Sequence, residues 1–136
     1  MSQYEIIRVF DAPRERVFRA WTDAARFARW FGLPDMSTEA VLDVRPGGAW
    51  RATLRDDDGF EVLLDGVYRE VAEPGRLVFT TGDPDDPGDG PASLVTVELA
   101  ESDGGTVMRF HQHGVNTGGG SGWAGFLDRL AEALVR

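Results

Sequence analysis

The sequence contains no cysteine and no lysine, and it has no long hydrophobic run. Without cysteine the chain cannot form disulfides, zinc–thiolate sites or a cysteine nucleophile, and this absence fits a cytoplasmic protein. No apolar run approaches the roughly 18 residues that suggest a membrane-spanning helix, so membrane insertion is not expected. The first ten residues lack the pattern of a secretion signal, so we expect the protein to be cytoplasmic.

Positive charge is also scarce. The chain has 23 acidic residues against 14 basic residues, all of them arginine, and its net charge is −9. Such a chain is repelled by phosphate backbones and anionic membranes, so we do not expect it to bind nucleic acid. Much of the acidity lies in two turn-like segments, 56–58 and 83–89, a distribution that is typical of solubilising loops.

The length of 136 residues, of which 42% are hydrophobic, predicts one domain over residues 1–136 with a real core. Periodicity and turn residues predict a strand, two helices, six further strands and a final helix. The expected strands are 4–10, 38–45, 49–55, 60–71, 76–81, 93–100 and 106–113. Strands joined by short turns indicate an antiparallel meander, so we expect an α+β fold with helices on one face of the sheet.

The helices are predicted from apolar residues at helical spacing and from capping residues. The first helix follows Pro13, the second carries Phe27, Trp30 and Phe31, and the third follows the glycine run 118–120. The expected N-caps are Asp11 or Ala12 for the first helix, Thr22 or Asp23 for the second, and Ser121 for the third.

The last hairpin can be predicted residue by residue. If Asp103 and Gly104 form the tight turn, one face of the hairpin is apolar and the other is polar. The apolar face then pairs Leu99 with Met108, Val97 with Phe110, and Val95 with Gln112. The polar face pairs Thr96 with His111, and Glu98 with Arg109 as an ion pair. This register points Gln112 into the interior.

No motif for a catalytic residue, a metal or a cofactor emerges, and we expect none of the three. His111 and His113 share a strand face, but the register turns them outward and no third ligand is evident. Ser121 fails the nucleophile pattern at its last position, and prolines break the calcium-loop spacing in the segment 83–89. The glycine run 118–120 is either a flexible connector or a hinge at a cavity mouth.

Aromatic residues are the most informative feature, with four tryptophans in a small chain. Aromatics at helical or strand spacing are usually core residues, yet an aromatic wall with few inward polar groups also forms an apolar pocket. The set is Trp21, Phe27, Trp30, Phe31, Trp50, Phe60, Tyr68, Phe79, Phe110, Trp123 and Phe126. The inward polar candidates are Gln112, Tyr68, Arg8 and Thr80. This composition favours binding over acid–base catalysis.

The order of several motifs resembles a known family. These motifs are Phe10-Asp11-Ala12-Pro13, Val17-Phe18-Arg19-Ala20-Trp21-Thr22-Asp23, Arg29-Trp30-Phe31-Gly32, Arg45-Pro46-Gly47-Gly48-Ala49-Trp50-Arg51, Gly66-Val67-Tyr68, Arg76-Leu77-Val78-Phe79, Gly105-Thr106, and Gly122-Trp123 with Leu127 and Leu130. In this order they resemble the activator of heat-shock-protein-90 ATPase homologue family, within the START-like (SRPBCC) superfamily. The resemblance extends over essentially the whole chain.

This resemblance implies a helix-grip fold, in which a curved antiparallel sheet of about six to seven strands wraps a long C-terminal helix and encloses an apolar cavity. By analogy, the cavity is lined by Trp30, Phe31, Trp50, Phe60, Tyr68, Phe79, Met108, Phe110, Gln112, Trp123 and Leu127. Relatives often carry histidine where this chain has Gln112. Many relatives are dimers, so the resemblance also suggests a homodimer.

Three functions are compatible with these observations. The first is non-catalytic binding of a small hydrophobic or amphipathic ligand, whose polar end would contact Gln112 and Tyr68. The second is a cyclase- or aromatase-like enzyme, which requires Asp65 or Glu61 to face inward through a bulge at Gly66. The third, implied by the resemblance alone, is a chaperone-binding role like that of the co-chaperone domain.

Overall fold

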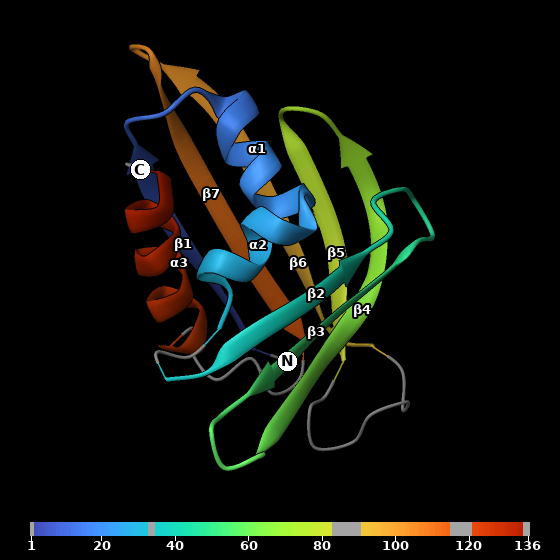
Figure 1. The fold of residues 1–136 in the computed structure, drawn as a ribbon. Coiled ribbons are helices and arrows are strands. Elements are labelled where there is room, and N and C mark those ends of the chain that lie inside the picture. The colour runs from blue at the N-terminus through green and yellow to red at the C-terminus, as the bar shows by residue number, and fades with distance from the viewer. Residues whose placement is uncertain (1, 33–34, 83–90, 115–120, 135–136) are drawn as a thin grey trace.

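A computed structural model of the chain describes residues 2–32, 35–82, 91–114 and 121–134. Within these ranges the elements follow the predicted order, as Figure 1 shows. The strands are β1 (Ser2–Phe10), β2 (Ser37–Leu42), β3 (Ala49–Arg55), β4 (Glu61–Ala72), β5 (Arg76–Gly82), β6 (Pro91–Ser102) and β7 (Gly105–Gly114). The helices are α1 (Arg14–Thr22), α2 (Ala24–Trp30) and α3 (Ser121–Leu134).

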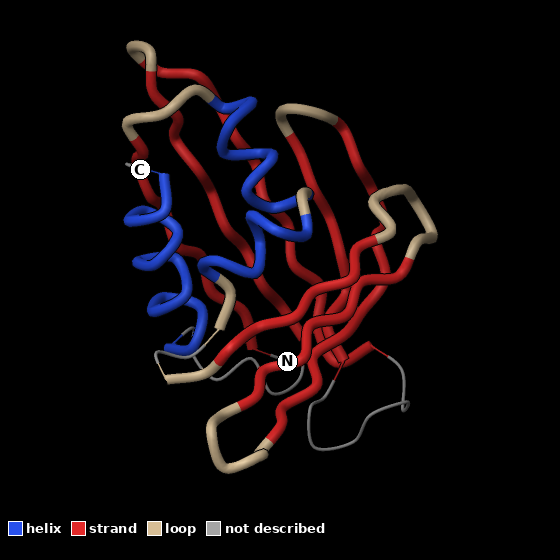
Figure 2. The backbone as a smooth tube through the Cα atoms, viewed as in Figure 1, coloured by secondary structure: helices blue, strands red, loops and turns tan. Residues whose placement is uncertain are grey.

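The strands form one seven-stranded antiparallel sheet in the order β1-β7-β6-β5-β4-β3-β2. Strands β2 to β7 follow one another as a meander, whereas β1 pairs with β7, the last strand in the chain. The helices all lie on one face of this curved sheet, which Figure 2 shows as blue coils against red strands. The predicted α+β helix-grip architecture is therefore confirmed.

The predicted register of the last hairpin is also confirmed. β6 and β7 pair Leu99 with Met108 and Val95 with Gln112, and both turn residues, Asp103 and Gly104, have positive φ angles of 51° and 82°. Such a turn matches the twist of the two strands, so it fixes the register.

The ion pair predicted within this hairpin is wrong, although Glu98 and Arg109 do lie opposite each other. Glu98 accepts a hydrogen bond of 2.7 Å from Arg76 on β5. Nε of Arg109 lies 3.6 Å from Oε2 of Glu5 on β1. Each charged group thus pairs with a strand that flanks the hairpin rather than across it.

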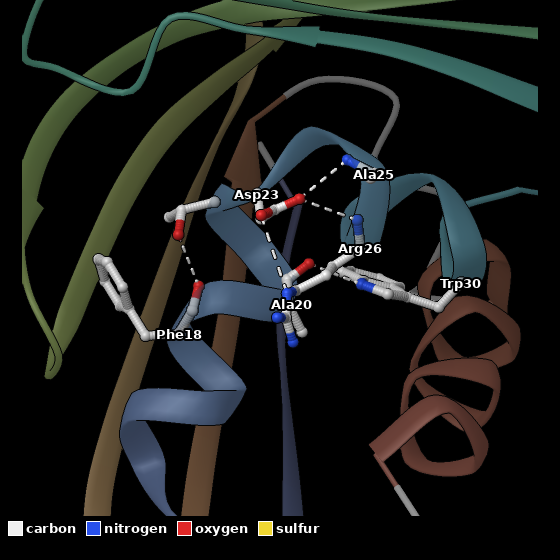
Figure 3. Close-up of polar contacts among 7 residues, drawn as sticks. Phe18, Ala20, Asp23, Ala25, Arg26 and Trp30 are labelled. Atoms are coloured by element: carbon white, nitrogen blue, oxygen red, sulfur yellow. Dashed lines mark hydrogen bonds and ion pairs between the residues drawn. The ribbon is translucent and has the colours of Figure 1, made fainter. Parts of the chain in front are cut away.

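The capping predictions have different outcomes. Asp23 caps α2, because its carboxylate accepts hydrogen bonds from the backbone nitrogens of Ala25 and Arg26 at 3.0 and 3.2 Å, as Figure 3 shows. The N-cap of α1 is Pro13 rather than Asp11 or Ala12, and proline has no side-chain acceptor for this role. α3 begins at Ser121, whose side chain lies outside the described part of the chain.

Replacing Asp23 with alanine is expected to lower the free energy of unfolding by about 1 kcal/mol, because two backbone donors at the start of α2 lose their acceptor. Urea denaturation followed by tryptophan fluorescence measures this change. The control is Asp11→Ala, which removes an exposed carboxylate outside any cap and should alter stability by less than about 0.5 kcal/mol. Equal losses in both variants would contradict the capping role.

The sheet turns a corner at Gly66. β4 pairs with β3 through Val67 and with β5 from Tyr68 onward. A Cβ atom on Gly66 would overlap the carbonyl oxygen of Thr80 and would lie 2.5 Å from Nε1 of Trp50. Glycine is therefore required for the close approach of a strand and an indole ring rather than for a bulge.

The bulge at Gly66 that the enzymatic alternative requires is thus not found. Gly66 stays in register with Trp50, and the register shift of β4 falls later, between Tyr68 and Glu70. In the part of β4 that pairs with β3, from Glu61 to Val67, side chains consequently alternate between the inner and the outer face without interruption.

Candidate functional site

Aromatic side chains from both layers of the fold meet between the sheet and the helices. We call them the aromatic cluster, in which each ring centroid lies 4.5–6.5 Å from another. Its members are Trp21, Phe27, Trp30, Phe31, Trp50, Tyr68, Phe79, Phe110, Trp123 and Phe126. Such ring pairs contribute about 0.5–1.5 kcal/mol each beyond the burial of their area.

Trp21, at the end of α1, connects the parts of this cluster. Its ring meets Trp30 edge to face at 4.7 Å, and it stacks on Phe110 from the sheet and on Trp123 from α3. Phe27 in turn stacks on Phe31 at 4.5 Å. The cluster therefore extends without interruption from the helices to the inner face of the sheet.

Backbone carbonyl groups orient two of the buried indole rings. Trp30 donates from Nε1 to the carbonyl oxygen of Ala20 at 2.9 Å, a contact drawn in Figure 3. Trp50 donates from Nε1 to the carbonyl oxygen of Thr80, also at 2.9 Å. Nε1 of Trp21 is equally buried but has no hydrogen-bond partner within the described ranges.

A short polar chain crosses the inner face of the sheet beyond the aromatic rings. Nε2 of Gln112 donates to Oγ of Ser93 at 2.7 Å, and Oγ of Ser93 shares a hydrogen bond with Oγ1 of Thr81. These three side chains lie on β7, β6 and β5, two residues along from Phe110, Val95 and Phe79 respectively. The apolar interior thus has one polar end.

The other predicted inward polar residues have specific partners. The Thr80 hydroxyl accepts a hydrogen bond of 2.9 Å from the backbone nitrogen of Val67. Arg8 forms an ion pair with Asp128 and so ties β1 to α3. Tyr68 is buried, and this burial, with a smaller contribution from the Asp43 carboxylate, raises the pKa of its phenol well above the usual value of about 10. Its hydroxyl is therefore neutral at physiological pH.

Most of the predicted lining residues come together, but Phe60 does not. Phe60 lies in the turn between β3 and β4 and is 62% exposed, so it lines no interior. Met108 and Leu127 are fully buried beside the aromatic cluster. The predicted lining set did not include Trp21, Phe27 and Phe126, although helical spacing places them on the same faces as residues that it did include.

The carboxylates required by the enzymatic alternative face away from the interior. Asp65 lies opposite Arg51, and Glu61 accepts a hydrogen bond of 2.6 Å from the exposed Arg55. Both share the outer face of β4 with Leu63, which is 45% exposed. Neither carboxylate can therefore act as an acid or base within the aromatic cluster.

The two histidines lie on the opposite face of β7 from Gln112, with ring centroids 5.7 Å apart. Nε2 of His111 lies 3.2 Å from Oε1 of Gln3. Among the residues that the structure describes, no group of three potential metal-binding side chains is found. None of the helices in these ranges combines the length and apolar composition that a membrane crossing requires.

Comparison with known families matches residues 11–135 to the model of the activator of Hsp90 ATPase homolog 1-like protein. The chain belongs to this family. The resemblance seen in the sequence motifs is thereby confirmed over nearly the whole length of the chain. A comparison with curated proteins gives no match.

Solved structures share the fold of this family member along nearly its full length. A protein from Chromobacterium violaceum is 26% identical with a TM-score of 0.86, and the alignment covers 98% of this chain and 97% of that one. An AHSA1-like protein from Aeromonas hydrophila is 25% identical with a TM-score of 0.85, covering 98% and 92%. A protein from Rhizobium leguminosarum is 29% identical with a TM-score of 0.77, covering 99% and 95%.

Proposed function

We propose that this protein binds a small hydrophobic or amphipathic molecule against the aromatic cluster and does not catalyse a reaction. The observation that carries the proposal is the cluster itself, which joins rings from the sheet and from all three helices around one apolar interior. Apolar sites with a few fixed polar groups are the usual form of a small-molecule site. The Gln112–Ser93–Thr81 chain supplies such groups at one end.

The cluster is most accessible at the start of α3. Trp123 and Phe126 are only partly buried, whereas Trp21, Trp30 and Phe31 are almost completely buried. The ring of Trp123 also packs against Phe110 with a centroid distance of 4.8 Å, so it connects the partly exposed edge with the inner face of the sheet. We propose that a ligand enters at this edge and packs against Trp123.

The inward polar groups support binding rather than acid–base chemistry. A catalytic acid or base needs a pKa near the working pH. Among the described residues, the polar groups inside include the Gln112 amide, threonine and serine hydroxyls, and a phenol whose pKa is raised further from neutrality. These groups are suited to orienting a ligand, not to exchanging protons with it.

Replacing Trp123 with alanine is expected to weaken binding of N-phenyl-1-naphthylamine, an uncharged fluorescent probe, by about tenfold or more. The reason is that the probe loses an aromatic partner and the apolar area that this ring buries. Fluorescence titration of the purified protein measures the dissociation constant.

Phe60→Ala is the matched control, because it removes another aromatic ring that lies outside the cluster. Its dissociation constant should equal that of the unmodified protein. A probe that fails to bind, or that binds both variants equally, would contradict the proposed site. Native mass spectrometry of the freshly purified protein then identifies any natural ligand by its mass.

A further inference from the structure

The Nε1 group of Trp21 is a buried hydrogen-bond donor for which the described residues hold no acceptor. Trp21 is 2% exposed, and its N–H has no partner within the described residues. An unpartnered buried donor loses its hydration without compensation, so native proteins rarely retain one without a reason. The neighbouring indoles of Trp30 and Trp50 both donate to carbonyl oxygens, so Trp21 differs from them in the same cluster.

The position of this donor connects it with the proposed site. Trp21 stacks on Trp123 at a centroid distance of 6.0 Å, and Trp123 forms the partly exposed edge of the cluster. Two other buried nitrogens lack a partner in the described ranges, Nε of Arg14 and Nδ1 of His113. Those two belong to partly exposed side chains that carry further nitrogen atoms. The indole of Trp21 has one nitrogen, which is buried, and its ring belongs to the cluster.

The charge of the interior restricts what can lie beside this donor. Among the described residues, the buried polar side chains are Thr80, Ser93, Thr106 and Gln112, none of which is charged. An anionic ligand would lose its hydration there without gaining a counter-charge, which is costly in a protein interior. Arg8, which faces α3, is already paired with Asp128.

We infer that the ligand is an uncharged hydrophobic molecule with an acceptor oxygen, such as a carbonyl, that takes the hydrogen bond of Trp21 Nε1. This inference rests on the proposed function and adds the chemical class of the ligand. It places the acceptor oxygen of the ligand next to α1. A second polar group of the ligand would then contact the hydrogen-bonded side chains Gln112, Ser93 and Thr81.

Three naphthalene probes of similar size test this inference. They are 2-acetylnaphthalene, which carries a ketone, 2-isopropylnaphthalene, which has no acceptor, and 2-naphthoate, which is an anion. We expect 2-naphthoate to bind at least about 100-fold more weakly than the ketone, because its charge is not compensated. Tighter binding of 2-naphthoate would overturn the inference.

The Trp21→Phe variant isolates the hydrogen bond. The ratio of the affinities for the ketone and the hydrocarbon should fall by about tenfold in this variant, since the donor is lost and the ring is kept. An unchanged ratio would overturn the inference and leave the proposed hydrophobic site intact. If none of the three probes binds the unmodified protein, both the inference and the proposed function are wrong.

A measurement on the unmodified protein keeps the test decisive if the variant does not fold. In a ¹H–¹⁵N spectrum, the indole N–H proton of Trp21 should move downfield when 2-acetylnaphthalene binds and much less when 2-isopropylnaphthalene binds. The N–H protons of Trp30 and Trp50 keep their backbone acceptors and serve as internal controls. If the Trp21 N–H instead contacts the ring face of Trp30, its proton stays upfield with the ketone bound, which would overturn the inference.

Discussion

Replacing Gly66 with alanine is expected to lower the free energy of unfolding by about 3–5 kcal/mol. The added methyl group would overlap the carbonyl oxygen of Thr80 and would crowd Nε1 of Trp50. Either β4 moves away from β5, or the Trp50 indole is displaced and loses its hydrogen bond to that carbonyl. The expected loss combines the cost of overpacking with the cost of an unsatisfied buried group.

Thermal unfolding followed by circular dichroism measures this effect, and the midpoint should fall by on the order of 10 °C. The matched control is Gly125→Ala in α3, where an added Cβ meets nothing within 4 Å. That change should be neutral or should stabilise the protein by up to about 1 kcal/mol, because alanine is a better helix former than glycine. A Gly66→Ala protein as stable as the control would contradict the close packing at this corner.

Replacing Trp30 with alanine is expected to cost about 3–5 kcal/mol of stability. Trp30 is completely buried, and its ring contacts Trp21 at 4.7 Å and Phe27 at 5.2 Å. The substitution also leaves the carbonyl oxygen of Ala20 without its indole donor. Urea denaturation should therefore show a large decrease in the midpoint with an unchanged slope.

Phe60→Ala again provides the comparison, since this exposed ring should contribute less than about 0.5 kcal/mol. If Trp30→Ala proved as stable as Phe60→Ala, the central packing of this indole would be refuted. The expected result also has a practical consequence. Lost ligand affinity in a Trp30 variant cannot be separated from lost stability, so Trp123 is the better position for testing binding.

The sequence predicted best where local rules decide the structure. The register of the β6–β7 hairpin is predicted to the residue, because the Asp103–Gly104 turn fixes it and the apolar face then follows by alternation. The same rule placed Gln112 inside. Alternation from Val95 and Phe79 also places Ser93 and Thr81 on the inner face. A polar side chain is rarely predicted to point inward, however, when its hydrogen-bond partner on the next strand is unknown.

The failures arose where distant segments decide the structure. Glu98 and Arg109 were predicted to pair with each other because the sequence does not reveal that β5 and β1 flank the hairpin. The sequence leaves open the bulge at Gly66 that the enzymatic alternative requires, because the contact of Gly66 with Thr80 joins two strands across a bend in the sheet. The inward position of Asp65 depended on that bulge, and Asp65 instead lies on the outer face opposite Arg51.

The sequence predicts only part of the candidate site, again because contacts between distant segments decide which residues meet. Trp30 and Trp50 were recognised, but Trp21 was assigned only to the general aromatic set. Its central place depends on how α1 lies over Phe110 and beside Trp123, which periodicity within one helix does not specify. Phe60 is in the lining set that the resemblance implies and begins an expected strand, whereas it belongs to the turn before β4.

The pairing of β1 with β7 has a consequence for the synthesis of the protein. Ile6 meets Phe110, so this early strand finds its hydrogen-bond partner only after about a hundred further residues have been added. At a ribosomal rate of about 5–20 residues per second, the strand waits on the order of 5–20 s with its ladder unformed. The whole sheet is thus completed late, and the nascent chain is exposed to chaperones and proteases until its last hairpin has emerged.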